Sequence, residues 1–471
     1  MDNKYKSIIP FPKSFKNAFK IPTLQLIVLA FLVGIVGGLI TIAFRLMINF
    51  IIDATFSGKI QFMFDSNAYI PPSVWGIGII FVPVLGGLLV SWLTENFAPE
   101  AKGHGVPEVL YAIHYKEGII RPIVAIIKAL ASAISIGTGG SVGREGPIIQ
   151  IGAAFGATLG QIIAMKTNQR IILIAAGAAA GIAATFSAPL AGVTFAIELI
   201  LVSIDALSIC LVTVAVVTAT IIAYFFAGDA PLFIWNISNQ NQSYYQQIFT
   251  ILLFIPFGVL VGIISATFIY AIDWFENWFD TTIKNHYIRH AVGMFFVGII
   301  FYLFMVFYGQ YYTAGIGDAT IQELLSNLIK NPCLLILLFV GKLLATCLTL
   351  GSGGSGGVFS PSLFLGATWG ALYGIVVNYL FPGLNIDSSF FVLAGMAGMV
   401  GGTTSAFITA IIIVFEVTQN YSNILPVMIT VAFAYLVRAY FSPESIYTLK
   451  IFRRGFSLPQ GLQANMSRRK K

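Results

Sequence analysis

The sequence has little charge. Only 10% of its 471 residues are Asp, Glu, Lys or Arg, whereas 57% are hydrophobic and the mean hydropathy is +0.87. Soluble domains usually carry about 25% charged residues, so this chain could not cover its surface in water. Apolar runs long enough to cross a hydrocarbon layer of about 30 Å recur along the whole chain. The composition excludes an ordinary soluble enzyme, a disordered chain and a secreted disulfide scaffold, and it predicts a polytopic membrane protein.

Cysteine is also scarce. The three cysteines, Cys210, Cys333 and Cys347, lie in apolar segments without the spacing of metal ligands. We therefore expect them to be small buried hydrophobic residues.

Catalytic motifs are missing as well. The chain has no His-Glu-x-x-His, no phosphate-binding loop and no Gly-x-Ser-x-Gly. Three of its four histidines are expected in polar connectors: His114, His286 and His290. We predict no enzyme activity, no metal site and no cofactor.

The net charge of +7 is concentrated at the chain ends, so it does not indicate a nucleic-acid partner. Residues 1–22 and 448–471 form basic segments before the first apolar run and after the last. Basic flanks stay on the cytoplasmic side of a membrane, which predicts that both termini are cytoplasmic. The first apolar run lacks a small-residue cleavage site and is read as a retained helix of a protein in the plasma (inner) membrane.

The abundant residue is glycine, with 46 copies in tight clusters. Small residues let membrane helices approach closely. They also let the backbone leave helical geometry, which at membrane depth is allowed only beside protein or a polar cavity. The glycine clusters therefore predict broken helices around a pathway.

Two halves of the chain resemble each other. Residues 128–160 align with 342–374, and a window ending at Glu198 aligns with one ending at Glu416. Lys, Pro and Glu match in these windows as well as Gly and Ala, which favours an internal duplication over shared low complexity. We predict a first membrane repeat over 23–227, a polar connector over 228–247 and a second repeat over 248–447. Duplicated halves with interrupted helices indicate a transport site at the repeat interface.

One carboxylate stands at a predicted break. Gly143-Arg144-Glu145-Gly146-Pro147 directly precedes an apolar helix. The N-terminus of a helix has unpaired N–H groups that favour negative charge, so Glu145 would occupy the place of an anion. A carboxylate that competes with a permeant anion for these donors is a gate. A structural Arg144–Glu145 pair or simple capping is the alternative.

Three further segments point to the same kind of site. Residues 356–361 offer backbone N–H groups at the equivalent break, without any charge, although a simple helix hinge is the alternative. Gly103-His104-Gly105-Val106-Pro107 predicts another helix start, where His104 is either an anion ligand or a structural histidine. Tyr447 follows the last apolar run, a position typical of an interfacial tyrosine.

Together these motifs resemble the CLC family of chloride channels and proton-coupled chloride antiporters. The similarity rests on the segment at 103–107, GREGPIIQIG at 143–152, GGVFSP at 356–361 and Tyr447, and it covers about residues 25–450. It implies an all-α polytopic membrane fold of two inverted repeats with tilted, partly broken helices. It also implies a homodimer in which each subunit holds its own anion pathway, with chloride as the bound and transported ion.

The resemblance also implies residue roles. Glu145 matches the external gating glutamate, and Lys128 matches a lysine that raises the potential in the pathway. His104, the amides of Val358 and Phe359 and the hydroxyl of Tyr447 would hold the central anion. The amides of three further residues would lie nearer the external site: Arg144, Gly146 and Ser360.

This chain departs from the family pattern at two positions. Leu199 stands where well-known bacterial antiporters carry a proton-relaying glutamate, and a leucine cannot hold a proton. His104 stands where the family usually has a serine. Because GREGP is retained, chloride is favoured over fluoride, with nitrate or bromide also open. The short tail after Tyr447 predicts that the paired nucleotide-sensing domains of many relatives are absent.

The sequence leaves three hypotheses. A passive or loosely coupled chloride channel is slightly favoured by Leu199. A chloride/proton antiporter is supported by Glu145, since protons could travel through water or another residue. A cation-coupled solute carrier is remote, because only Glu145, Glu198 and Glu416 are clear intramembrane acids.

Overall fold

The computed structural model describes residues 21–59, 68–228, 232–235, 244–384, 386–419 and 424–458. These residues form helices joined by short connections, and their only β-type pairing is two isolated bridges. The predicted connector over 228–247 and both basic end segments lie largely outside the described residues.

The first half of the chain contains eight α-helices, two π-helical turns (η1 and η4) and two 3₁₀ turns (η2 and η3). Their bounds are α1 Thr23–Ile52, η1 Asp53–Ser57, η2 Gly76–Phe81, α2 Val82–Asn96, η3 Pro99–Ala101, α3 Val106–Tyr115, α4 Ile123–Gly137, α5 Glu145–Ile162, α6 Thr167–Phe186, α7 Pro189–Phe195, η4 Ala196–Ile200 and α8 Ala206–Ala227.

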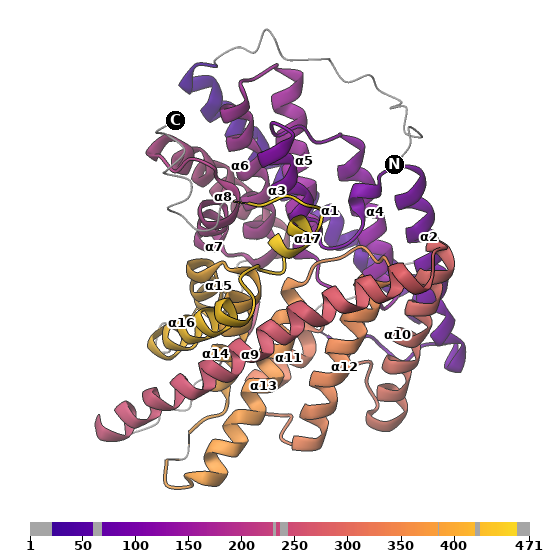
Figure 1. Cartoon of the computed structure of the whole chain (residues 1–471), viewed down its shortest axis with the longest axis vertical. Coiled ribbons are helices and arrows are strands. Elements are labelled where there is room, and N and C mark those ends of the chain that lie inside the picture. The colour runs from indigo at the N-terminus through magenta and orange to yellow at the C-terminus, as the bar shows by residue number, and fades with distance from the viewer. Residues whose placement is uncertain are drawn as a thin grey trace.

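The second half repeats the pattern with nine described α-helices. Their bounds are α9 Tyr244–Thr282, α10 His286–Tyr308, α11 Asp318–Leu325, α12 Pro332–Gly351, α13 Phe359–Leu380, α14 Ser389–Thr404, α15 Phe407–Thr418, α16 Ile424–Phe441 and α17 Thr448–Arg453. In Figure 1 the indigo-to-magenta half lies mostly above the orange-to-yellow half, and α17 lies near their boundary.

Nine helices of the described part are long and apolar enough to cross a membrane. Four shorter apolar helices, of 10–17 residues, accompany them: Ile123–Gly137, Pro189–Ile200, Ser389–Thr404 and Phe407–Thr418. A helix rises about 1.5 Å per residue, so these four cannot span about 30 Å alone. The predicted all-α polytopic membrane fold with interrupted helices is confirmed.

The breaks in the two halves have the same backbone geometry. Gly139, which follows α4, has φ +100°, and Gly353, which follows α12 at the equivalent position, has φ +117°. This left-handed region favours glycine because a Cβ would clash with the neighbouring backbone. The backbone therefore leaves helical geometry at matching positions in both halves, directly after α4 and α12.

The two halves also exchange helix caps. The carboxylate of Glu198 accepts hydrogen bonds from the N–H groups of Ile408 (2.7 Å) and Thr409 (2.8 Å) at the start of α15. Conversely, Glu416 accepts from Leu190 (2.9 Å) and Ala191 (2.7 Å) at the start of α7. Each glutamate thus accepts hydrogen bonds from backbone N–H groups at a helix start in the opposite half. This capping is a structural role.

Glycines allow the closest helix contacts. A Cβ on Gly152 of α5 would lie 2.2 Å from the carbonyl oxygen of Gly177 in α6. The equivalent pair, Gly366 of α13 and Gly395 of α14, is as close, with 2.1 Å from a Gly366 Cβ to the Gly395 oxygen. Larger residues would push these helices apart, since both contacts are to backbone.

Two expectations about single residue types are wrong. Cys347 is buried, but Cys210 and Cys333 are exposed at the outer surface of the described helices. A membrane protein turns apolar side chains toward lipid, so an apolar segment does not imply burial inside the protein. The three histidines expected in connectors lie instead within helices: His114 in α3, His286 and His290 in α10.

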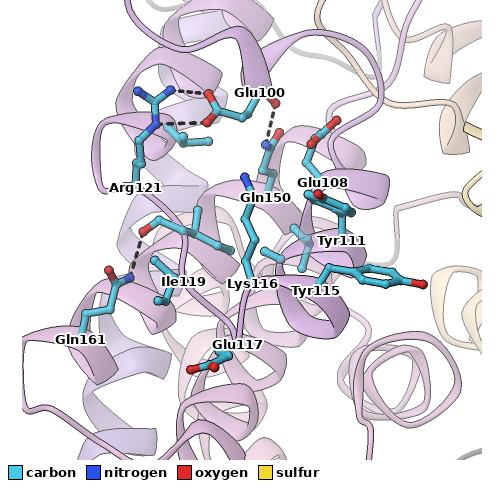
Figure 2. Close-up of a pocket in the computed structure, with 14 residues that line it drawn as sticks. Glu100, Glu108, Tyr111, Tyr115, Lys116, Glu117, Ile119, Arg121, Gln150 and Gln161 are labelled. Carbon is cyan, nitrogen blue, oxygen red and sulfur yellow. Dashed lines mark hydrogen bonds and ion pairs between the residues drawn. The ribbon is translucent and has the colours of Figure 1, made fainter. Parts of the chain in front are cut away.

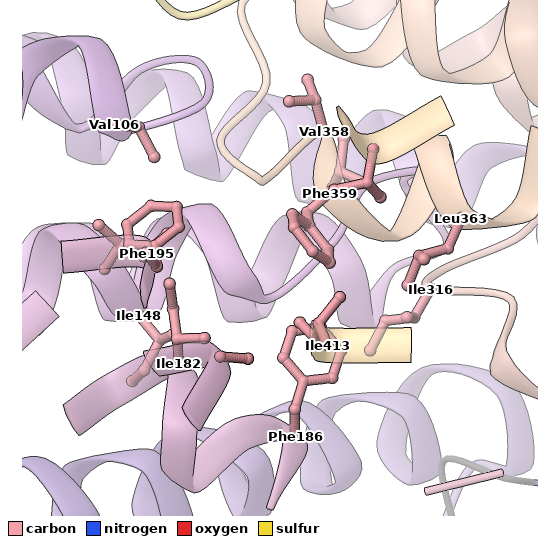
Figure 3. Close-up of a cluster of buried hydrophobic side chains, with 14 of the residues drawn as sticks. Val106, Ile148, Ile182, Phe186, Phe195, Ile316, Val358, Phe359, Leu363 and Ile413 are labelled. Atoms are coloured by element: carbon pink, nitrogen blue, oxygen red, sulfur yellow. The ribbon is translucent and has the colours of Figure 1, made fainter. Parts of the chain in front are cut away.

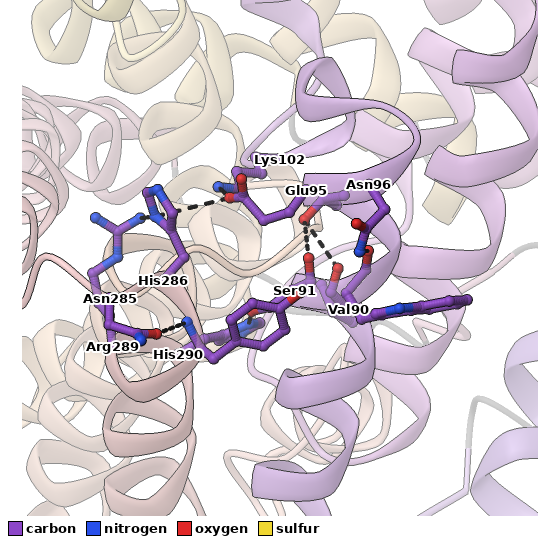
Figure 4. A network of polar contacts seen from close by, with 12 residues as sticks. Val90, Ser91, Glu95, Asn96, Lys102, Asn285, His286, Arg289 and His290 are labelled. Carbon is purple, nitrogen blue, oxygen red and sulfur yellow. Dashed lines mark hydrogen bonds and ion pairs between the residues drawn. The ribbon is translucent and has the colours of Figure 1, made fainter. Parts of the chain in front are cut away.

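The buried His290 belongs to a polar network between α2 and α10 (Figure 4). Its Nδ1 lies 3.0 Å from the hydroxyl of Ser91. Near it, Glu95 of α2 pairs with Lys102, directly before Gly103. The Glu95–Lys102 pair therefore anchors the segment that leads into α3.

Replacing Glu198 by leucine should lower the thermal unfolding midpoint, because the two N–H groups at the start of α15 would lose their acceptor inside the protein. An unsatisfied buried donor costs about 1–3 kcal/mol. Fluorescence-detected unfolding in detergent measures the shift, with the exposed Glu117→Gln as the control that should unfold like the wild type. Equal midpoints for Glu198→Leu and the control would contradict the capping role.

Candidate functional site

Three broken segments meet at one place. Residues 143 and 357 exchange two backbone hydrogen bonds, from the Gly143 N–H to the Gly357 oxygen (2.8 Å) and back (2.6 Å). The Gly103 N–H donates to the oxygen of Gly354 (2.9 Å), and the Gly356 N–H donates to that of Gly103 (3.3 Å). The breaks before α3, α5 and α13 are therefore one unit.

The predicted gate lies at this junction. Glu145 is in the first turn of α5 and only 1% exposed. Its carboxylate accepts from the hydroxyl of Ser360 (2.6 Å) and from the Ser360 N–H (3.3 Å) in the first turn of α13. A carboxylate of one half thus occupies anion-type donors at a helix start of the other half.

Val358 and Phe359 are 1% and 3% exposed. Their side chains lie in an apolar cluster with Phe186 and Ile413 (Figure 3). The ring centroids of Phe359 and Phe186 are 5.4 Å apart. Because these side chains pack into the cluster, only the backbone N–H groups are available to an anion, as the resemblance implies.

His104 precedes α3, whose N-cap is Gly105 with φ +87°. A Cβ on Gly146 would lie 2.2 Å from the carbonyl oxygen of His104. His104 therefore packs directly against the first turn of α5, next to the gate.

Lys128 is fully buried in α4 and supports the His104 segment. Its ammonium donates to the carbonyl oxygens of Ala101 (3.0 Å) and Gly103 (2.7 Å). The lysine thus adds positive charge beneath the segment and also fixes its conformation.

Tyr447 is 1% exposed and caps the short helix α17. The N–H of the preceding residue, Ile446, donates to the carbonyl oxygen of Thr403 in α14 (2.9 Å), and the Thr403 hydroxyl lies 3.3 Å from that of Ser362 in α13. Tyr447 is therefore held inside the protein beside these two helices. The default interpretation as an interfacial tyrosine is therefore wrong.

Sequence reasoning missed an ion pair on the α11 side of the site. Arg144 contacts Asp318, the first residue of α11, at 3.3 Å. Nearby, buried Lys342 donates to the carbonyl oxygens of Gly315 (2.8 Å) and Ile316 (3.1 Å), and both Asp318 and Glu145 act on it electrostatically. The internal duplication could have identified these residues, because Lys342 aligns with Lys128 and Asp318 aligns with His104.

Leu199 lies away from these contacts. It is half-buried in η4 and packs against the apolar core, next to Glu198, which caps α15. Neither residue touches the junction of the three breaks through any contact in the described part.

A cavity of about 520 Å³ opens beside α3 on the side that faces α17 (Figure 2). Glu108, Tyr111, Tyr115 and Gln150 are among the residues that line it. The buried Gln150 lies 2.9 Å from a Cβ placed on Gly105, so the cavity reaches the start of α3. No group of three or more metal-ligating side chains occurs in the part of the chain with described positions.

These features define the class of protein: a polytopic membrane protein with a buried site of backbone donors that a carboxylate occupies. Such a site suits an anion.

Comparison with known proteins shows the family of this chain. The model of the voltage-gated chloride channel family matches residues 86–439. The H(+)/Cl(-) exchange transporter ClcA of Vibrio cholerae is 30% identical over 466 residues, covering 96% of this chain and 94% of its own. ClcA of Vibrio parahaemolyticus is 31% identical, covering 91% and 90%. The chain therefore belongs to the CLC family and is a chloride-transport protein.

Solved structures agree on the fold. A slow cyanobacterial Cl⁻/H⁺ antiporter superposes with a TM-score of 0.80 at 26% identity, covering 93% of this chain and 99% of that one. A CLC-type fluoride/proton antiporter gives a TM-score of 0.72 at 22% identity, covering 90% and 97%, and supports the fold alone.

Replacing Gly146 by alanine should reduce chloride flux strongly, because the new Cβ would meet the His104 oxygen at 2.2 Å and the Gly357 Cα at 2.8 Å. Both neighbours are backbone and cannot rotate away. Chloride efflux from liposomes measures the loss. Gly78→Ala is the matched control, since its nearest contact would be 3.7 Å, and it should transport like the wild type.

Replacing Tyr447 by phenylalanine should weaken chloride binding about 10- to 160-fold, because one hydrogen bond to a charged group contributes about 1.5–3 kcal/mol. Isothermal titration calorimetry in detergent measures the affinity. Tyr440→Phe, an exposed tyrosine on α16, is the control. Unchanged affinity in Tyr447→Phe would remove the hydroxyl from the anion site.

Proposed function

We propose that this protein exchanges chloride for protons across the membrane. The observation that carries the proposal is the Glu145 carboxylate on the N–H and hydroxyl of Ser360, because a titratable group there exchanges place with an anion and carries a proton. The similarity to ClcA proteins over almost the whole chain supports the same function. This reverses the slight preference for a passive channel drawn from Leu199.

The geometry supports a simple exchange cycle. Ionised Glu145 holds the donors of Ser360 and blocks the pathway. Protonation neutralises the carboxylate, so these donors bind it less strongly and an anion displaces it. The anion then rests on the N–H groups of Val358 and Phe359 and the hydroxyl of Tyr447. When Glu145 loses its proton on the opposite side, the carboxylate returns and expels the anion.

Lys128 and Lys342 act from behind the pathway. Each is fully buried and bonds only to backbone oxygens among its described partners. Their positive charge stabilises an anion without binding it directly, so the anion can still leave. Chloride is the transported ion, no cofactor takes part, and Leu199 carries no proton.

The basic segments at both chain ends and the family suggest the oligomeric state, the membrane and the orientation of the protein. We propose a homodimer in the plasma membrane, with one pathway per subunit and both termini in the cytoplasm. The side of the site that carries α17 then faces the cytoplasm, and the side that carries α11 faces outward. Membership of a chloride-transport family leaves the cation-coupled solute carrier without support.

A chloride gradient should drive uphill proton movement in liposomes that contain the wild-type protein. Glu145→Gln should retain chloride flux and lose both proton movement and its pH dependence, because glutamine stays neutral at all pH values. Chloride and pH electrodes record both fluxes. Glu323→Gln, which alters a carboxylate that bonds Tyr69 elsewhere, is the control and should keep the exchange. Chloride flux without proton movement in the wild type would refute the antiporter in favour of the channel.

A further inference from the structure

His104 has an unsatisfied polar atom. Its side chain is only 4% exposed, and its Nδ1 has no hydrogen-bond partner among the described residues. Buried polar atoms are normally paired, and an orphan in a native structure indicates a missing ligand, water or proton. The anion-site role implied by the family is usually served by serine, so a histidine offers something a hydroxyl does not.

The side chain borders a small cavity on the α17 side of the site. This cavity, about 10 Å³, is close to the space that one water molecule needs. Its polar lining consists of His104, Asp273 and Glu276 of α9 and Lys450 of α17, and four apolar side chains complete it: Ile269, Ile272, Ile446 and Leu449. Titratable side chains thus lie beside the imidazole on the α17 side.

The duplication shows what His104 lacks. Its equivalent in the second half is Asp318, which pairs with Arg144 at 3.3 Å. The residue equivalent to Arg144 is Val358, which has no charge. His104 therefore lacks the counter-charge that its counterpart has. An anion bound to the Val358 N–H would therefore supply the charge that His104 lacks, as Arg144 does for Asp318.

The surrounding charges oppose a permanently protonated His104. Burial disfavours an imidazolium most strongly, and Lys450 and Arg454 of α17 and Lys128 of α4 act in the same direction, whereas Glu276 of α9 favours it. Glu276 is itself neutralised in part by its 2.5 Å ion pair with Lys450. The other acids nearby are also paired, Asp273 with Arg453, Glu108 with Arg454 and Glu145 with the Ser360 donors. One more negative charge beside the imidazole decides its protonation.

We propose that His104 is the proton acceptor on the α17 side of the pathway, and that it takes up a proton only while chloride occupies the adjacent central position. This rests on the proposed exchange function and supplies the relay that Leu199 cannot. Glu276 is a positioning residue that favours the imidazolium through its charge.

The transfer balances without a further reactant. A hydronium ion in the cavity gives its proton to the lone pair of Nδ1, which leaves water and an imidazolium beside chloride. The N–H bond then breaks as an O–H bond forms on the Glu145 carboxylate, which leaves neutral His104 and neutral Glu145. The imidazolium of His104 and the bound chloride balance each other's charge in this intermediate. Because each ion stabilises the other, chloride transport and proton transport are coupled.

Chloride-dependent proton uptake tests the first step. Glu145→Gln protein in weakly buffered detergent should take up protons on addition of chloride, and the uptake should grow toward low pH, because burial and the nearby cations disfavour the imidazolium in the absence of the anion. A pH indicator measures the uptake, and calorimetry verifies chloride binding. The double variant Glu145→Gln/His104→Gln should bind chloride without proton uptake. Glu145→Gln/His290→Gln is the matched control, because it alters a second buried histidine, which bonds Ser91 of α2, and it should behave like Glu145→Gln.

Two results would overturn the inference: chloride binding without proton uptake in Glu145→Gln, or equal uptake in the His104 double variant. His104→Ser replaces His104→Gln if the latter does not fold. Glu145→Gln/Glu276→Gln gives a second measurement, because loss of the facing carboxylate should move the midpoint of uptake to lower pH. An unmoved midpoint would exclude Glu276 from the role.

Coupled flux tests the consequence. In liposomes, the proton-to-chloride ratio of His104→Gln should fall at least about tenfold below that of the wild type, even where its chloride flux also changes, since one acid–base group contributes about 10²–10⁴-fold to a proton-transfer rate. A wild-type ratio in His104→Gln would overturn the inference and leave the exchange function intact. Absence of proton movement in the wild type would refute the exchange function, whereas the uptake assay would still decide the chloride dependence of His104.

Discussion

The structure depends on unpaired N–H groups at helix starts that the protein buries together. In a membrane, each such group costs several kcal/mol unless something accepts its hydrogen bond. The breaks before α5 and α13 meet through the two bonds between Gly143 and Gly357, and the donors of Ser360 hold the Glu145 carboxylate. An anion pathway follows from this constraint, because the donors require a negative partner and tolerate exchange between two of them.

The surrounding protein keeps this arrangement rigid. Lys128 and Lys342 fix the segments before α3 and α11 by bonding their carbonyl oxygens, and Glu198 and Glu416 fix the starts of α15 and α7. Each of these contacts occurs twice, once in either half. The halves therefore support each other. Two buried lysines and two half-buried glutamates, which could be taken for transport groups, make structural hydrogen bonds.

Asymmetry between the halves creates the function. Glu145 has no acidic equivalent, since residue 359 is phenylalanine, so only one half supplies a gate. Asp318 has Arg144 as its partner, whereas its equivalent His104 faces an uncharged position. A duplicated scaffold thus holds two titratable groups, Glu145 and His104, whose equivalents in the other half have a different chemistry.

The sequence by itself determined the class of fold and the positions of the breaks, and it singled out Glu145 as the candidate gate. Glycine clusters, the Pro107 and Glu145 helix starts and the repeat are local or periodic signals, and hydropathy requires the chain to lie in a membrane. Only the tertiary structure decided which groups meet. The Ser360–Glu145 contact, the Arg144–Asp318 pair and the unpaired Nδ1 of His104 join residues far apart in the chain. It also corrected the burial of Cys210 and the place of His290, because an apolar run does not tell which of its faces meets lipid and which meets protein.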